Sequence, residues 1–181
     1  MSNNYSDVIE FWFEQIPAQA WWQKNNEFDA LVTQKFANTL CLAEQELLPE
    51  WRQSAEGRLA EIIVLDQFSR NIYRGTAKAF ANDNLALLLA QQMIELGLDK
   101  HFIQPKLGFV YMPFMHSESK EVHEQAVLLF SQADMQTQLD FELRHKAIID
   151  QFGRYPHRNH ILGRISTAEE VEFLQQPGSS F

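Results

Sequence analysis

Arginine and histidine side chains are concentrated in three short polar segments of an otherwise acidic chain. The segments cover residues 66–75, 113–118 and 153–159. Six of the eight arginines lie in or beside them, at Arg70, Arg74, Arg144, Arg154, Arg158 and Arg164. Five of the six histidines fall between positions 116 and 160. Because a planar guanidinium binds carboxylates and phosphates through two parallel hydrogen bonds, this composition predicts a local anion-binding site.

The side chains of these segments suggest two roles in a pocket for a small phosphate- or carboxylate-bearing ligand. The candidates for ligand binding are Arg70, Asn71, Arg74, Arg154, Arg158, Asn159, Arg164, Asp66, Asp83 and Ser117. The candidates for acid–base chemistry are His116, His157, His145 and Glu118, since an imidazole titrates near neutral pH. No nucleophile elbow, phosphate loop or dinucleotide fingerprint accompanies these residues, so the sequence leaves open whether the chain is an enzyme.

A metal centre is a less favoured use of the same segments. His116, Glu118, His123 and Asp66 are of metal-binding types, but they show neither an HExxH motif nor a regular ligand spacing. The sequence therefore predicts no metal and no cofactor.

Two other hypotheses explain the polar segments without a reaction. In the first, they form a buried structural network, because Asp66 and Arg70 lie four residues apart on an apolar helix face and a buried charge needs a partner. The arginines of the 153–166 connection would then pair with Asp66, Asp83, Glu118 and Asp150. In the second, the chain is a protein or peptide interaction module whose arginines and asparagines clamp a carboxylate. His145 and His123 lie on or beside apolar faces, where a histidine is more often a core residue than a catalyst.

Composition limits the class of partner and the compartment. A net charge of -9 disfavours nucleic acid and anionic membranes as partners, since both would be repelled. Cys41 is the single cysteine, which excludes an internal disulfide and a zinc ribbon. The first residues carry no secretion signal and no apolar run is long enough to span a bilayer, so we expect a cytoplasmic protein. The oligomeric state is left open.

The elements that must position these side chains are predicted to be helices. Apolar residues recur with a helical period, and seven glycines and six prolines leave little material for an all-β fold. We expect a single all-α domain over residues 1–181, an antiparallel helical array or bundle of about seven to nine helices. The expected helices cover residues 7–14, 26–46, 55–73, 82–96, 120–133 and 138–152, with a short helix after Pro105 that Pro113 bends or stops and a last helix announced by the capping box at 166–169.

Several of these motifs together resemble the bacterial domain-of-unknown-function family 924. The resemblance rests on 11–13, 21–22, 65–75 with 79–81 and Asp83, 113–118, 145–164 and 177–181, in that order along the chain. It implies an all-helical, tetratricopeptide-like fold and no known activity. Ser69 stands where the family usually has proline, and residues 119–123 depart from the acidic stretch common after His-Ser-Glu.

Overall fold

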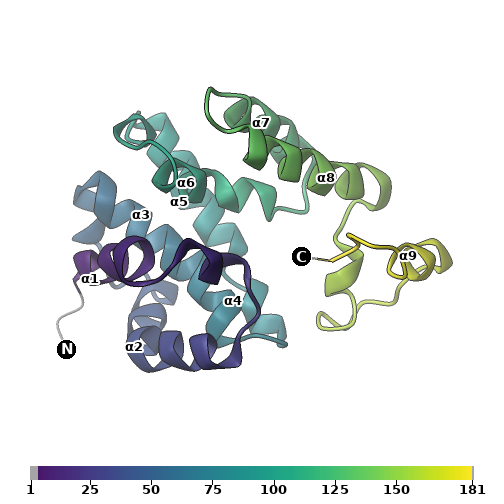
Figure 1. Ribbon diagram of the computed structural model, residues 1–181, viewed down its shortest axis with the longest axis horizontal. Helices are drawn as coiled ribbons and strands as arrows, with labels where there is room; N and C mark the ends of the chain where they lie inside the picture. The colour runs from purple at the N-terminus through teal and green to yellow at the C-terminus, as the bar shows by residue number, and fades with distance from the viewer. Residues whose placement is uncertain (1–3, 181) are drawn as a thin grey trace. The chain divides into compact units, whose positions relative to one another are not determined.

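The computed structural model describes residues 4–180, and all regular structure in that range is helical (Figure 1). The all-α class predicted from the apolar spacing is therefore confirmed. Residues 1–3 and Phe181 lie outside the described residues. The first three were part of the segment expected to carry no secretion signal, and Phe181 was part of the family resemblance. None of the helices in residues 4–180 has the length and apolar character that a membrane span needs.

The chain forms two compact units. The first contains residues 4–74 and 78–113, and the second contains residues 75–77 and 114–180. The predicted polar segments are divided between them: 66–74 lies in the first unit and most of 113–118, with all of 153–159, in the second. The expectation of one domain over the whole chain stays a prediction, as does the tetratricopeptide-like arrangement.

The first unit is built from short and long helices joined by tight connections. Its elements are α1 (Tyr5–Glu10), η1 (Phe11–Gln15), η2 (Ala18–Trp22), α2 (Asn26–Glu44), η3 (Trp51–Gln53), α3 (Ala55–Ile63), η4 (Val64–Phe68), α4 (Ser69–Ile72), α5 (Asp83–Glu95), η6 (Asp99–His101) and most of α6 (Lys106–Met115), while η5 (Ala77–Phe80) begins at the unit boundary. Asn25 caps α2 by accepting hydrogen bonds from the amides of Glu27 and Phe28. The predicted bounds of α2 and α5 agree with the structure within about two residues, the usual uncertainty of helix ends.

One continuous helical run, α3–η4–α4, forms the centre of this unit. Its apolar residues Leu59, Ile62, Ile63, Val64, Leu65 and Phe68 are all buried, because α1 and α5 pack against α3 and α2 packs against η4 and α4. The middle segment, η4, is a π-helix, and it carries the buried polar pair Asp66 and Gln67. The prediction that this run is buried on every side is confirmed for these residues.

Pro113 was expected to bend or stop its helix, and of these two outcomes the stop is wrong. Helix α6 continues through Pro113 to Met115. Proline removes one backbone donor and crowds the preceding turn, but here only two residues follow it, so few hydrogen bonds depend on the disturbed turn.

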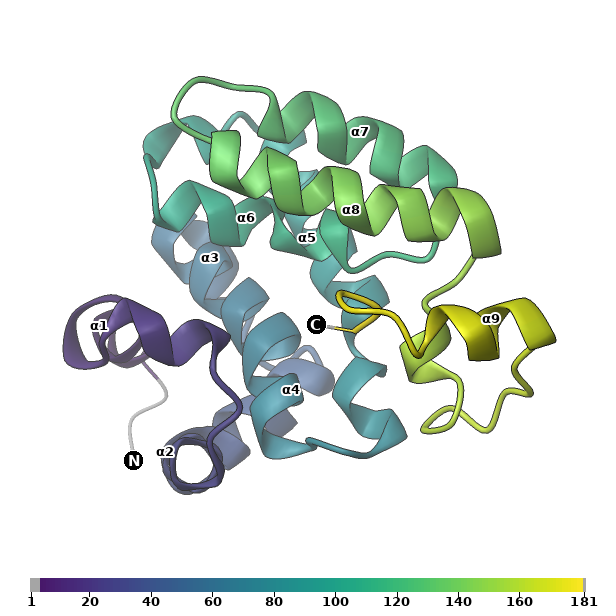
Figure 2. The same cartoon turned by 45° about the vertical axis from the view of Figure 1, so that its right-hand side comes forward.

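The second unit contains a helical hairpin followed by an irregular arm. Helices α7 (Lys120–Phe130) and α8 (Gln136–Phe152) pack side by side in antiparallel orientation (Figures 1 and 2). Gly153 ends α8 in the left-handed conformation, where a residue without a side chain is favoured. The arm then forms the single turn η7 (Pro156–Arg158) and the short helix α9 (Ala168–Phe173). A capping box is present at the start of α9, but it is formed by Thr167 and Glu170, one residue later than the predicted 166–169 pattern.

Candidate functional site

In the first unit, an aspartate that the sequence did not single out joins two predicted site residues. Asp29 lies in the first turn of α2 and is buried. Its Oδ1 accepts hydrogen bonds from Asn71 Nδ2 at 2.8 Å and Arg74 Nη2 at 2.8 Å, and Arg74 Nε binds its other oxygen. Burial alone would raise the pKa of Asp29, but the hydrogen bonds from Arg74 and Asn71 outweigh it and lower the pKa. Asn71 and Arg74 thus bind a carboxylate of the chain itself.

Arg70 is held in the same way by two acids. Its Nη1 and Nη2 bind Asp83 at 2.9 and 3.1 Å, a two-pronged contact with the first residue of α5. Nη1 also donates to the carbonyl oxygen of Asp66 at 2.7 Å and lies 3.3 Å from its carboxylate. The ion pair between Asp66 and Arg70, proposed as the structural alternative, is therefore present.

In the second unit, Glu170 gathers the side chains of the irregular arm. Arg154 Nε and Nη2 bind its two oxygens at 2.6 and 2.8 Å. Asn159 Nδ2 donates to Glu170 at 3.2 Å, and the amide of Thr167 donates at 2.7 Å. These donors lower the pKa of Glu170 to about 2, the bond from Arg154 having the largest effect. The arm between α8 and α9 is therefore closed around one buried carboxylate.

A second carboxylate, Glu118, connects the start of the hairpin to the same arm. Arg164 binds both of its oxygens at 2.7 and 2.9 Å, and the backbone amide of Tyr155 donates to Oε1 at 2.8 Å. Burial would raise the pKa of Glu118, but the bonds from Arg164 and Tyr155 and the charge of Arg158 bring it below its ordinary value. A carboxylate engaged on both oxygens and held ionised is suited to positioning the arm rather than to donating a proton.

Tyr155 is the point at which the remaining predicted side chains meet. It is fully buried. The guanidinium of Arg158 lies 4.6 Å from its ring centroid, and the rings of His157 and His145 lie 5.5 and 5.8 Å away. Arg158 Nη2 also donates to the carbonyl oxygen of His116 at 3.1 Å. The structure thus brings His145, His157 and Arg158 together around one aromatic ring, and Arg158 binds the backbone of His116. We call these residues, with Tyr155, the Tyr155 cluster.

His145 is uncharged in this cluster. Burial lowers its pKa to about 3, against the opposing hydrogen bond to the carbonyl oxygen of Phe141, and the nearby His116, His123 and His157 lower it further. Because a carbonyl only accepts, Nδ1 carries the proton and donates it at 2.8 Å. The Nε2 lone pair is therefore the side of the ring that can accept a proton or a hydrogen bond.

Sequence reasoning missed the role of His123 and the presence of Glu142. His123 Nδ1 lies 2.7 Å from Glu142 Oε1, and both side chains are fully buried. One signal could have identified Glu142: it precedes His145 by three residues, so the two share the buried face of α8. No sequence pattern links Glu142 to His123. Ser117 contacts the pair through its backbone, because its carbonyl oxygen accepts a hydrogen bond from His123 Nε2 at 2.9 Å.

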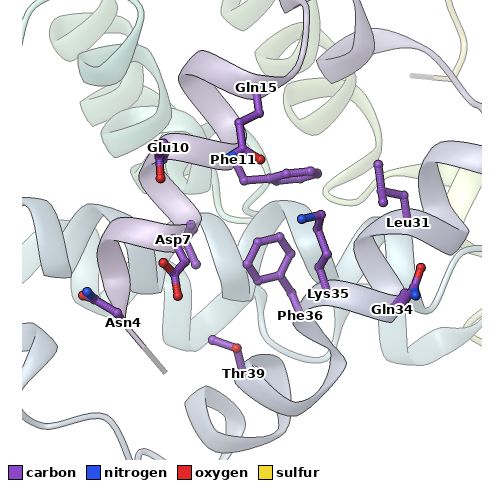
Figure 3. Close-up of a pocket in the computed structure, with 11 residues that line it drawn as sticks. Asn4, Asp7, Glu10, Phe11, Gln15, Leu31, Gln34, Lys35, Phe36 and Thr39 are labelled. Carbon is purple, nitrogen blue, oxygen red and sulfur yellow. The ribbon is translucent and has the colours of Figure 1, made fainter. Parts of the chain in front are cut away.

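One pocket in the described part of the chain is lined by none of the predicted site residues. It is a partly open groove of about 580 Å³ in the first unit, between α1–η1 and α2 (Figure 3). Its lining combines the rings of Phe11 and Phe36 with the charged side chains of Asp7, Glu10 and Lys35 (Figure 3). In the described part of the chain, no three histidine, cysteine or acidic side chains are arranged to hold a metal ion.

Glu170 provides a test of how the arm is held. We expect Glu170→Gln to lower the free energy of unfolding at neutral pH by about 2 kcal/mol, because glutamine keeps the capping box but removes the charge that binds Arg154. The loss should shrink with acid. A carboxyl whose pKa is depressed from 4.5 to about 2 stabilises the fold above pH 4.5, and that contribution disappears as the pH falls toward 2.

Urea unfolding of the Glu170→Gln variant at several pH values measures this effect. Glu169→Gln is the matched control, since Glu169 is the exposed neighbour on the same helix turn. Equal losses in the two variants, or a Glu170 effect that does not change with pH, would show that the depressed pKa does not contribute to stability.

Comparison with known proteins gives a family and one solved structure. The family model described as "Bacterial protein of unknown function (DUF924)" matches residues 8–178. A protein of unknown function from Agrobacterium tumefaciens, ATU0120, has a similar solved structure with a TM-score of 0.89 and 34% sequence identity, covering 94% of this chain and 96% of that one. No curated protein matches the chain.

Proposed function

The chain belongs to the bacterial family of unknown function DUF924, and we propose that it binds a small anion carrying a phosphate or carboxylate group at the Tyr155 cluster. The observation that carries the proposal is the guanidinium of Arg158, buried and stacked on Tyr155 beside the rings of His157 and His145. Guanidinium and imidazole groups supply directional N–H donors. In this cluster the guanidinium of Arg158 supplies the positive charge, and the neutral ring of His145 supplies a hydrogen-bonding group beside it.

The contacts of the other arginines narrow the proposal to this cluster. Arg70, Arg74, Arg154 and Arg164 each bind a carboxylate of the chain through two nitrogens. A ligand at any of them would have to displace that carboxylate, and breaking a paired buried charge costs about 3–5 kcal/mol. We therefore assign these four arginines to holding the helices and the arm in place. We place ligand binding at Arg158 because its guanidinium lies over the ring of Tyr155, beside the rings of His157 and His145. The same contacts weaken the peptide-clamp hypothesis.

Within this proposal the acid–base candidates separate by environment. His145 is neutral at pH 7 and offers only the Nε2 lone pair, so it suits hydrogen bonding to a protonated ligand group. Glu118 positions the arm. His116 and His157 remain the candidates for proton transfer, and we propose a cytoplasmic location for the protein.

Binding of simple anions with two arginine variants tests the proposal. Thermal unfolding of the full chain would be followed with inorganic phosphate, pyrophosphate and small di- and tricarboxylates. An anion present at a hundred times its dissociation constant adds about 2.7 kcal/mol to the free energy of unfolding. We expect Arg158→Gln to abolish this gain. Arg154→Gln, in the same arm, should destabilise the free protein and keep the gain.

Two outcomes would overturn the proposal. One is a wild-type protein that none of these anions stabilises. The other is an Arg158→Gln variant that gains as much stability as the wild type. If an anion does stabilise the wild-type protein, isothermal titration with that anion separates binding at a site from a general effect of salt on stability.

A further inference from the structure

A buried histidine and glutamate lie behind the Tyr155 cluster, His123 on α7 and Glu142 on α8. We propose that these two side chains share one proton and act as positioning residues for Tyr155 and, through it, for the anion site. The shared proton is inferred from geometry alone. The positioning part rests on the proposed function of the Tyr155 cluster.

The hydrogen-bond partners of Nε2 place the first proton of His123. Nε2 lies 2.9 Å from the carbonyl oxygen of Ser117 and 3.2 Å from the hydroxyl oxygen of Tyr155. The Tyr155 hydroxyl donates its own hydrogen to the carbonyl oxygen of Met115 at 2.5 Å. Both neighbours of Nε2 therefore present lone pairs, so Nε2 must carry a hydrogen.

The other nitrogen then requires a second proton between the two side chains. Nδ1 lies 2.7 Å from Glu142 Oε1, and at that distance two facing lone pairs would repel each other. A proton must lie between them, either as a carboxylic acid donating to a neutral imidazole or as an imidazolium donating to a carboxylate. Both arrangements have zero net charge, which a fully buried pair requires, since an isolated charge there would be costly.

The environment of Glu142 favours the form with the proton near the carboxyl group. Burial raises the pKa of Glu142, although the hydrogen bond and charge of His123 oppose the rise. Its Oε2 is buried and has no hydrogen-bond partner among residues 4–180, as suits a group that carries little charge. Three other titratable groups on α8 act on the pair: the charge of Lys146 acts on Glu142, and His145 and Asp150 interact with His123. His145 also interacts with His116, which precedes α7, and with His157 in η7.

The pair reaches the anion site through the hydroxyl end of Tyr155, while the other end is anchored separately. The hydroxyl is held by His123 and Met115, and the backbone amide is held by Glu118. Between these two anchors lies the ring on which Arg158 stacks and beside which His157 lies. A change in the orientation of His123 would therefore move the surface that orients both groups, although neither contacts Glu142.

Nitrogen NMR of the free full-length protein, labelled on histidine, tests the shared proton without a ligand. We expect Nε2 of His123 to show the chemical shift of a protonated ring nitrogen, and Nδ1 a shift between those of a protonated and an unprotonated nitrogen, because Nδ1 shares its hydrogen with Glu142. In Glu142→Leu, Nδ1 should show the shift of an unprotonated nitrogen, because the second partner of the proton is gone. A wild-type Nδ1 with the shift of an unprotonated nitrogen would overturn the proposal.

Phosphate or carboxylate binding, with the anion identified by thermal unfolding, tests the positioning role. In Glu142→Gln the glutamine can still donate an N–H to Nδ1, so the dissociation constant of the anion should stay within about twofold of the wild-type value. Glu142→Leu should raise the dissociation constant of the anion about tenfold, a change of 1.4 kcal/mol. Tyr155→Phe removes only the hydroxyl that links Tyr155 to His123, and it supplies a second test if the leucine variant does not fold. We expect it to raise the dissociation constant of the anion several-fold. Unchanged affinity in Tyr155→Phe would overturn the positioning role. A wild type that binds none of the anions removes the proposed function and this role with it, while the NMR result on the proton stands by itself.

Discussion

Gly57→Ala is expected to lower the free energy of unfolding by more than about 3 kcal/mol, although alanine favours a helix by about 1 kcal/mol over glycine. Gly57 lies in the first turns of α3, where a Cβ would stand 2.1 Å from the carbonyl oxygen of Trp51 and 2.8 Å from its carbonyl carbon. These are backbone atoms of a residue whose side chain is fully buried, so they cannot retreat without moving the core. The overlap therefore outweighs the helix propensity.

Gly108→Ala is the matched control for this prediction. Gly108 is also helical, but a Cβ there would meet the side-chain oxygen of Gln104 at 3.1 Å, and that side chain can adjust. Urea unfolding should show a change within about 1 kcal/mol for Gly108→Ala. A Gly57 variant as stable as the Gly108 variant would mean that the link between η3 and α3 yields easily.

Arg52→Ala is expected to cost about 3–5 kcal/mol, because it leaves a fully buried carboxylate without its cation. Arg52 Nε and Nη2 bind the two oxygens of Glu61 at 2.9 and 2.7 Å, and Glu61 has a side-chain exposure of 0%. The remaining nitrogen, Nη1, binds Glu46 at 3.1 Å, whose side chain is 56% exposed. One guanidinium thus joins a buried and an exposed acid.

The two acids allow an internal comparison. Glu46→Ala should cost no more than about 1 kcal/mol, since exposed ion pairs are weak. The double change of Arg52→Met with Glu61→Leu should recover most of the stability that Arg52→Ala loses, because it removes both charges and keeps apolar volume. Denaturant midpoints and slopes measure all three variants. Equal costs for Arg52→Ala and Glu46→Ala would show that water reaches Glu61 in solution.

The helices could be predicted because their signals are local. The buried stripe of Leu59, Ile62 and Ile63 and the capping box before α9, predicted one residue early, are patterns of three and four residues, which match the geometry of one helical turn. The π-helical segments η1 and η4 were not predicted. A shift of the hydrogen-bond partner by one residue changes the backbone and leaves no mark in the order of apolar side chains.

The ion pairs were easiest to predict where they are local, although the expected pairing of the 153–166 arginines with the distant Glu118 is also formed, by Arg164. Asp66 and Arg70 are four residues apart and were identified as a possible pair, and they do lie in contact. Asp29 binds Arg74 from 45 residues away, and no pattern in the sequence connects the two. Charged residues carry no period that specifies a distant partner. The sequence therefore identified Arg74 and Arg154 as candidate residues, while the acids that bind them, Asp29 and Glu170, were found only in the structure.

The spans of the ion pairs bear on the order in which the contacts form during folding. Arg164 and Glu118 close a loop of 46 residues, whereas Arg154 and Glu170 close one of 16. Loop-closure entropy makes the longer closure less favourable by about 1 kcal/mol if the chain between is flexible. The turn around Glu170 can thus form from its own segment of chain. The ion pair between Arg164 and Glu118 becomes favourable only after α7 and α8 have paired, because their pairing shortens the distance between these two residues.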